Sequence, residues 1–142
     1  MQPNSAAETE IAQINALEDA LDNIRRIQSK LAETGLTQAV FSTDGPLSNS
    51  TLDSTRSAIG LEFQSLVQNI RAIKATDPIA EAYPDIHYDL KDQIARRNWL
   101  AHEYGTRALV KWSEVAISIY NDVPKIESAI MAALEAVGIQ KP

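Results

Sequence analysis

The chain has 142 residues, of which 44% are apolar and 23% are charged, and it contains no cysteine. This length suits one globular domain with its own core, and the lack of cysteine excludes a disulfide framework, thiolate catalysis and a thiolate metal site. The formal net charge of −6 argues against a general nucleic-acid binder, because counterion release requires clustered Lys and Arg.

Apolar residues at three- and four-residue steps predict a long amphipathic helix over residues 5–34, and Gly35 fits the left-handed position that ends a helix. Residues 36–41 add one short turn before a loop at residues 42–46. A second helix is predicted over about residues 50–75. A short helical turn then runs from Asp77-Pro78 through Ala82, and Tyr83-Pro84-Asp85 is the next break, since proline disfavours helix in the residue before it.

The second half of the chain predicts two more helices. One starts near Asp85 and ends at Gly105, and the other runs from about Thr106 to Val137. Pro124 lies inside the last helix and should kink it, because proline has no backbone donor. No segment alternates with a period of two. The sequence therefore predicts an all-α fold of four long helices, packed as antiparallel neighbours, in a single domain over residues 1–142 with its core at about 5–137.

The start of the chain has neither the basic region nor the apolar region of a secretory signal. No apolar run approaches the roughly 20 residues that span a bilayer. We therefore expect a cytoplasmic protein without a membrane partner. The sequence also lacks an obvious ligand cluster, so no metal and no cofactor are expected.

The densest group of chemically active side chains is Arg97-Asn98-Trp99-Leu100-Ala101-His102-Glu103-Tyr104. Histidine can accept and donate a proton near pH 7, and arginine offers a permanent charge and a planar fork for phosphate oxygens. Attack of an RNA 2′-hydroxyl on its own phosphate needs a base for the hydroxyl and a cation for the charge that develops at phosphorus. The surrounding residues 91–111 carry a net charge of +3 in an otherwise acidic chain, from Lys91, Arg96, Arg97, Arg107 and Lys111 against Asp92 and Glu103.

Arg97 and His102 are five residues apart, so on one regular helix their side chains point about 140° away from each other. Two routes would bring them together: a helix that loosens near Gly105, or two copies of the chain that pool their side chains across a symmetric interface. Asn98 shares a helix face with His102 and could fix its tautomer or position a phosphate. Tyr104 shares a face with Arg97.

The same residues also admit a structural interpretation. An arginine and a histidine near a helix end often serve as a cap and a surface ion pair, and a charged run is often a solvated helix face. Trp99 and Trp112 fit packing anchors, and His87 fits a structural histidine. Spacing alone leaves catalysis and structure both open.

The pattern Arg-x-x-x-x-His-x-Tyr, with a polar residue directly after the arginine, resembles the signature of HEPN-domain proteins, specifically the HepT-like toxins. Tyr83-Pro84-Asp85-Ile86 resembles the Tyr-Pro-x-Ile lead-in of that family, and Trp112 with Asn121-Asp122-Val123-Pro124 resembles its Trp and Asn-Asp-Leu-Pro spacing. Ile59-Gly60 is weakly similar to an Ile-Gly-Glu-Ala stretch, but Leu61 intervenes before Glu62, so that glutamate is not carried over. The resemblance covers about residues 10–137 in pattern and is specific from about 83 to 130.

The resemblance implies a four- to five-helix up-down bundle that forms a homodimer with two motifs in a shared cleft. It implies the toxin of a type VII-like HepT/MNT toxin–antitoxin system, a metal-independent endoribonuclease acting on tRNA or mRNA, with Arg97 and His102 as the catalytic pair and Asn98 assisting. On this interpretation Arg96, Arg107 and Lys111 contact RNA phosphates.

The resemblance also implies a partner, an MNT-type minimal nucleotidyltransferase antitoxin. In the family this antitoxin can transfer AMP from ATP to the tyrosine of the motif, here Tyr104. An AMP group there would add phosphate charge that repels RNA and could pair with Arg97.

Two other functions stay open. The chain could be a non-catalytic helical binding subunit of a minimal nucleotidyltransferase, with the motif holding only phosphate. It could also be a dimeric helical protein whose motif has lost its activity. Metal-free cleavage of labelled tRNA separates the ribonuclease from both.

Overall fold

A computed structural model gives the fold and describes residues 5–101 and 110–139, with side chains from residue 10 onward. The described residues form helices and connecting segments without a strand, which confirms the all-α class. The elements are α1 (Ser5–Thr34), α2 (Gln38–Phe41), α3 (Ser50–Arg71), α4 (Pro78–Ala82), η1 (Pro84–His87), α5 (Leu90–Ala101), α6 (Trp112–Ala116), η2 (Ile117–Asp122) and α7 (Val123–Ala136). The short element η1 is a 3₁₀ helix, and η2 is π-helical.

Hydrogen bonds to nearby residues mark the end of α1 and the start of α3. Gly35 has a φ of 66° and its N–H donates to the Leu31 carbonyl at 2.9 Å, so it ends α1 as predicted. The side chain of Asn49 accepts from the Leu52 N–H at 3.0 Å and caps α3. The predicted helix over 5–34 and the predicted short helical turn through Ala82 are confirmed, whereas α3 ends at Arg71, short of the predicted residue 75.

The predicted helix from Asp85 to Gly105 is wrong at its start. Residues 84–87 form the 3₁₀ turn η1, and Asp89 follows with a φ of 46° before α5 begins at Leu90. Aspartate tolerates this left-handed conformation better than most side chains. The break keeps Ile86 fully buried while it redirects the chain into α5. The predicted end at Gly105 lies outside the described residues.

The predicted last helix also differs at its start. Val110 and Lys111 are not helical, and α6 begins at Trp112; residues 106–109 lie outside the description. The kink expected at Pro124 stays a prediction, but a π-helical segment, η2, ends at Asp122, two residues before the proline. A proline ring clashes with the carbonyl four residues earlier in an α-helix, and a wider turn relieves that clash. Gly138, with a φ of 85°, follows the end of α7.

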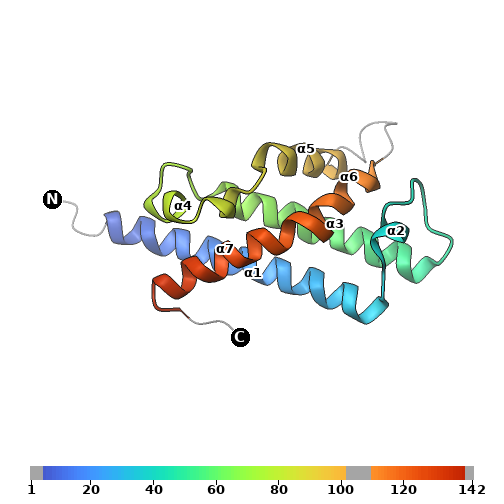
Figure 1. The fold of residues 1–142 in the computed structure, drawn as a ribbon, viewed down its shortest axis with the longest axis horizontal. Coiled ribbons are helices and arrows are strands. Elements are labelled where there is room, and N and C mark those ends of the chain that lie inside the picture. Colours follow the sequence, from blue (N-terminus) through green and yellow to red (C-terminus); the bar gives the residue numbers. More distant parts are fainter. Residues whose placement is uncertain (1–4, 102–109, 140–142) are drawn as a thin grey trace.

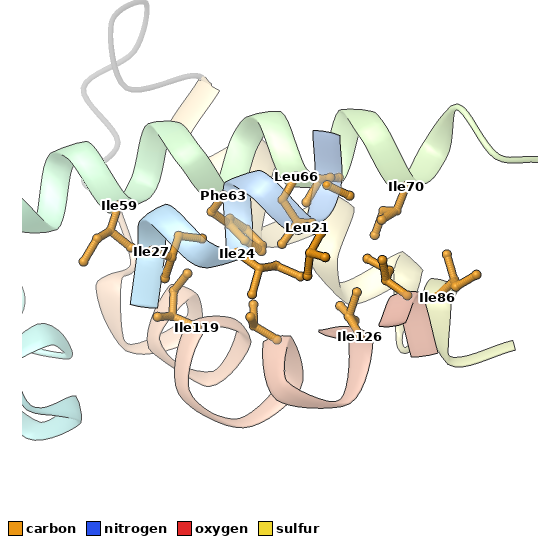
Figure 2. Packing of buried hydrophobic residues seen from close by; sticks show 14 of the residues in the cluster. Leu21, Ile24, Ile27, Ile59, Phe63, Leu66, Ile70, Ile86, Ile119 and Ile126 are labelled. Carbon is orange, nitrogen blue, oxygen red and sulfur yellow. The ribbon is translucent and has the colours of Figure 1, made fainter. Parts of the chain in front are cut away.

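The core lies where α1, α3 and α7 meet (Figures 1 and 2). Figure 2 shows Ile24 of α1, Phe63 of α3 and Ile126 of α7 turned toward one another, and each is fully buried. The apolar stripes of the helices supply this core at three- and four-residue steps. Ile11 of α1, by contrast, is 57% exposed, although its spacing fits the apolar stripe of that helix.

Polar side chains fix the direction in which α1 and α3 pair. Asn23 of α1 donates to Glu62 at 3.0 Å and accepts from Asn69 at 2.8 Å, while Gln13, further toward the N-terminus of α1, donates to Asp77 beyond the end of α3. The two helices therefore run antiparallel, as Figure 1 shows. Within residues 5–101 and 110–139, no helix combines the length and hydropathy that a bilayer crossing requires.

Candidate functional site

Helix α5 carries Arg97 and Asn98 and is held close to α3 at a glycine. A Cβ atom added at Gly60 would lie 3.3 Å from Cδ2 of Leu100 and 3.6 Å from Cη2 of Trp112. Leu100 itself is 4% exposed. The small residue on α3 therefore sets how closely α5 approaches, and with it the position of Arg97, three residues before Leu100.

A buried polar network ties α5 to η2. Gln93 of α5 donates from Nε2 to Oδ2 of Asp122 at 2.8 Å and accepts at Oε1 from the Ser118 hydroxyl at 2.5 Å. Arg96 donates from Nη1 to the same Asp122 oxygen at 2.9 Å and to Ser118 Oγ at 3.2 Å. Gln93 and Ser118 are fully buried and Asp122 is 5% exposed. Each of these polar groups therefore has a hydrogen-bond partner within the network, as buried polar groups in proteins generally do.

Arg96, expected to contact RNA phosphate, belongs to this network. Its side chain is 12% exposed and forms ion pairs with Asp122 at 2.9 Å and with Glu114 at 3.4 Å. Two carboxylates therefore compensate its charge, the buried one of Asp122 and the exposed one of Glu114. Arg96 therefore lies at the joint between α5 and η2 with its charge paired, and its expected contact with RNA phosphate stays a prediction.

Arg97 differs from its neighbour. Its Nη1 donates to Oδ1 of Asn98 at 3.3 Å, so the two predicted site residues are in contact. Its Nε is buried without a hydrogen-bond partner, and no carboxylate among the described side chains forms an ion pair with it. A buried donor without a partner costs free energy and calls for a functional or structural reason. Arg97 is thus a half-buried cation whose charge the described fold leaves uncompensated.

Trp99 and Lys111 form the edge of a hollow beside Arg96. The Lys111 ammonium lies 4.8 Å from the centroid of the Trp99 ring. Lys111 is exposed and makes no ion pair with the described carboxylates, so its expected role as a phosphate contact stays a prediction. The hollow has a volume of about 310 Å³ and is lined by Asp92, Ala95, Arg96, Trp99, Lys111 and Glu114. A second hollow, of about 610 Å³, lies between α1, α4 and α7 and includes Gln13, Asp77 and Val137.

Three predicted site residues, His102, Tyr104 and Arg107, lie outside the described residues, as does Glu103. The last described residue before them is Ala101, the end of α5, which is exposed. The structure therefore gives the surroundings of Arg97 and Asn98, and the pairing of Arg97 with His102 stays a prediction.

Sequence reasoning missed a buried arginine in the core. Arg56 of α3 is 1% exposed and donates to three carbonyls, that of Phe41 at the end of α2 at 3.0 Å and those of Thr43 and Gly45 in the following loop at 2.6 Å each. Its guanidinium also stacks 4.3 Å from the centroid of the Trp112 ring. Arg56 thus closes the loop after α2, and no local pattern distinguishes it from a surface arginine.

The residues expected to be structural have structural contacts. His87 Nε2 lies 2.7 Å from the Ile70 carbonyl at the end of α3. Trp112 is 7% exposed and packs edge-on against Phe41 at 5.6 Å between ring centroids. Glu62 accepts from Arg26 of α1 at 2.9 Å. Burial raises the pKa of Tyr120 to about 12, and its hydroxyl donates to the Leu36 carbonyl at 2.5 Å.

Comparisons with protein-family models, with curated proteins and with solved structures find no match to this chain. Within the part of the chain that the structure describes, no group of three or more His, Asp and Glu side chains is arranged to hold a metal ion.

Proposed function

We propose that this chain is a HEPN-type, HepT-like ribonuclease toxin that cuts RNA without a metal, with Arg97 and His102 as the catalytic pair. The observation that carries the proposal is the state of Arg97. Its guanidinium lies in contact with Asn98, its Nε has no partner, and no described carboxylate compensates its charge. Arg96, the next residue, has two carboxylate partners. Of these two arginines, Arg97 is the one with charge to offer a phosphate.

The proposed reaction is an internal transfer at phosphorus. His102 removes the proton from a ribose 2′-hydroxyl, whose oxygen attacks the adjacent phosphorus. Arg97 stabilises the charge that develops on the phosphoryl oxygens. The bond from phosphorus to the 5′-oxygen breaks, and the protonated imidazole returns its proton to that oxygen. The products are a 2′,3′-cyclic phosphate and a 5′-hydroxyl, and no atom or electron is left unassigned.

A homodimer supports this chemistry geometrically. Arg97 and His102 would point about 140° apart if they belonged to one regular helix. In the proposed dimer the two α5 helices pack together, so that Arg97 of one copy works with His102 of the other. We place the protein in the cytoplasm, where its tRNA or mRNA substrate is found, within an up-down helical bundle.

The proposed control is AMP transfer to Tyr104 by a minimal nucleotidyltransferase antitoxin. The phosphate of AMP would take the place of an RNA phosphate at Arg97, whose charge lacks a described partner. Tyr120 is a poor alternative acceptor, because its pKa is raised to about 12 and its hydroxyl is engaged by Leu36. A nucleophilic phenol needs the opposite properties.

Cleavage of end-labelled tRNA in the presence of a metal chelator tests the proposal. Wild-type protein should give discrete fragments, and Arg97→Ala and His102→Ala should each lower the rate by about 100-fold or more, the usual contribution of one acid–base or electrostatic group. Arg71→Ala is the control, since Arg71 is an exposed arginine at the end of α3. Far-ultraviolet circular dichroism verifies that each variant folds. Binding of tRNA without cleavage would instead identify a non-catalytic subunit.

A further inference from the structure

We propose that the hollow beside Trp99 binds one nucleobase of a single-stranded RNA, with guanine preferred; this inference rests on the proposed ribonuclease function. The hollow has a volume of about 310 Å³, at the lower end of the range for small-molecule sites, which suits a single nucleotide unit. Trp99, which lines the hollow, lies on α5, two residues after Arg97.

The stacking surface of this site is the Trp99 ring. Trp99 is half-buried, so the fold fixes the ring while part of its surface stays accessible. The Lys111 ammonium lies over the ring at 4.8 Å, the place where a base would stack. Lys111 is exposed and on a flexible stem, and an exposed cation–π contact is weaker than base stacking on an aromatic ring. A base can therefore displace the ammonium, which then remains at the edge of the hollow as a hydrogen-bond donor.

The polar lining selects among the bases. Among the described lining residues, Arg96 is engaged by Asp122 and, through its Nε, by Oε2 of Glu114. The remaining polar groups there are the Asp92 carboxylate, the Oε1 atom of Glu114 and the Lys111 ammonium; carboxylates only accept hydrogen bonds. The side chain of Glu114 is 48% exposed and its single described contact, with Nε of Arg96, is long at 3.4 Å. Guanine is the base whose pairing edge carries two adjacent donors, N1–H and the N2 amino group. One carboxylate can accept both, and the guanine O6 can accept from Lys111.

Tryptophan fluorescence with nucleoside monophosphates tests the site without requiring catalysis. The chain has two tryptophans, and Trp112 is buried against Phe41, so quenching by a bound base reports on Trp99. GMP should quench the fluorescence and bind about tenfold or more tighter than AMP, CMP or UMP, the discrimination expected of a bidentate pair. Trp99→Leu should abolish the quenching. Glu114→Gln should remove the preference for GMP, while Glu135→Gln, an exposed carboxylate on α7, should keep it.

The outcomes separate this inference from the proposed function. If the protein cleaves RNA but no nucleotide quenches its fluorescence, the base site is refuted and the ribonuclease activity is supported. Quenching by GMP in a protein that cuts no RNA would support the base site and refute the ribonuclease. Equal quenching by all four nucleotides would contradict the selection of guanine by Glu114.

Discussion

Nη1 of Arg96 lies 2.9 Å from Oδ2 of Asp122, and this ion pair joins the helix that carries Arg97 to the π-helical turn before Pro124. The two side chains are 12% and 7% exposed. Removing one partner of a buried pair leaves an uncompensated charge and costs about 3–5 kcal/mol. The ion pair therefore holds α5 in place. Arg97, the residue after Arg96, has no carboxylate partner among the described side chains.

We expect Asp122→Ala to lower the free energy of unfolding by about 3 kcal/mol, because it strands Arg96 and removes an acceptor from Gln93. Urea denaturation measures the change. Asp92→Ala, which removes an exposed carboxylate from the same helix, should change the stability by less than about 0.5 kcal/mol. Equal effects of the two substitutions would show that the pair does not stabilise the fold.

Gly60→Leu should displace α5 from α3, because the new side chain would overlap Leu100 and Trp112. Overpacking of this kind costs about 1–3 kcal/mol, and the displacement should also lower RNA cleavage, since Arg97 moves with α5. Thermal unfolding and the cleavage rate are measured together. Ser57→Leu, an equally large change on the exposed face of α3, should affect neither. Wild-type stability and cleavage in Gly60→Leu would contradict the close approach of the two helices.

Tyr120 should make the fold sensitive to high pH. Burial raises its pKa from 10.0 to about 12, so the folded state holds the phenolic proton more tightly than the unfolded state does. Its contribution to stability is therefore fully present below pH 10 and is lost as the pH rises toward 12. Denaturation at several pH values should show a loss of stability in this range that is smaller in Tyr120→Phe. An identical pH profile in the two proteins would show that Tyr120 is not the responsible group.

Tyr104 should be the residue that an MNT-type nucleotidyltransferase modifies. Incubation with such an enzyme and ATP is expected to raise the mass of the wild-type chain by one or more AMP groups and to stop RNA cleavage. Tyr104→Phe should not gain mass, whereas Tyr88→Phe, which removes a half-buried tyrosine bonded by Lys125, should react as the wild type does. Labelling of Tyr104→Phe at the wild-type level would place the modification elsewhere.

Mixed dimers test whether two copies share one site. If Arg97 of one copy works with His102 of the other, an equal mixture of Arg97→Ala and His102→Ala should regain about a quarter of the wild-type rate, since half of the dimers would then hold one intact site of two. Mixing Arg97→Ala with the double variant Arg97→Ala/His102→Ala should regain none. No recovery in the first mixture, despite exchange of subunits, would place both residues in one copy.

Much of the fold followed from local pattern. Gly35 ends α1 and Asn49 caps α3 through contacts with residues at most four positions away, which a sequence displays directly. The break at Asp89 was hidden, because Ile86, Leu90 and Ile94 keep a four-residue spacing across it. A left-handed aspartate leaves no periodic signal in the sequence, and the full burial of Ile86 beside it is visible only in the structure.

The sequence indicated which residues belong to the candidate site, but not which partners their side chains contact. The sequence placed Arg96 and Arg97 together in a positive segment, and nothing local distinguished them. Their difference depends on Asp122, which lies 26 residues away from Arg96 in the chain and is brought near by the packing of η2 on α5. Burial of polar residues is a property of the tertiary structure, so the sequence did not predict the buried positions of Gln93 and Ser118 either.

The chemical identity of the RNA ends is the most direct test of the central claim, that Arg97 and His102 drive attack by the 2′-hydroxyl. We predict that wild-type protein, in the presence of a chelator, yields fragments with a 2′,3′-cyclic phosphate and a 5′-hydroxyl, and that a single 2′-deoxy substitution at the cut position prevents cleavage. Arg97→Ala and His102→Ala should yield almost no such fragments. Fragments with a 5′-phosphate, continued cleavage at the 2′-deoxy position, or wild-type rates in both variants would contradict the account.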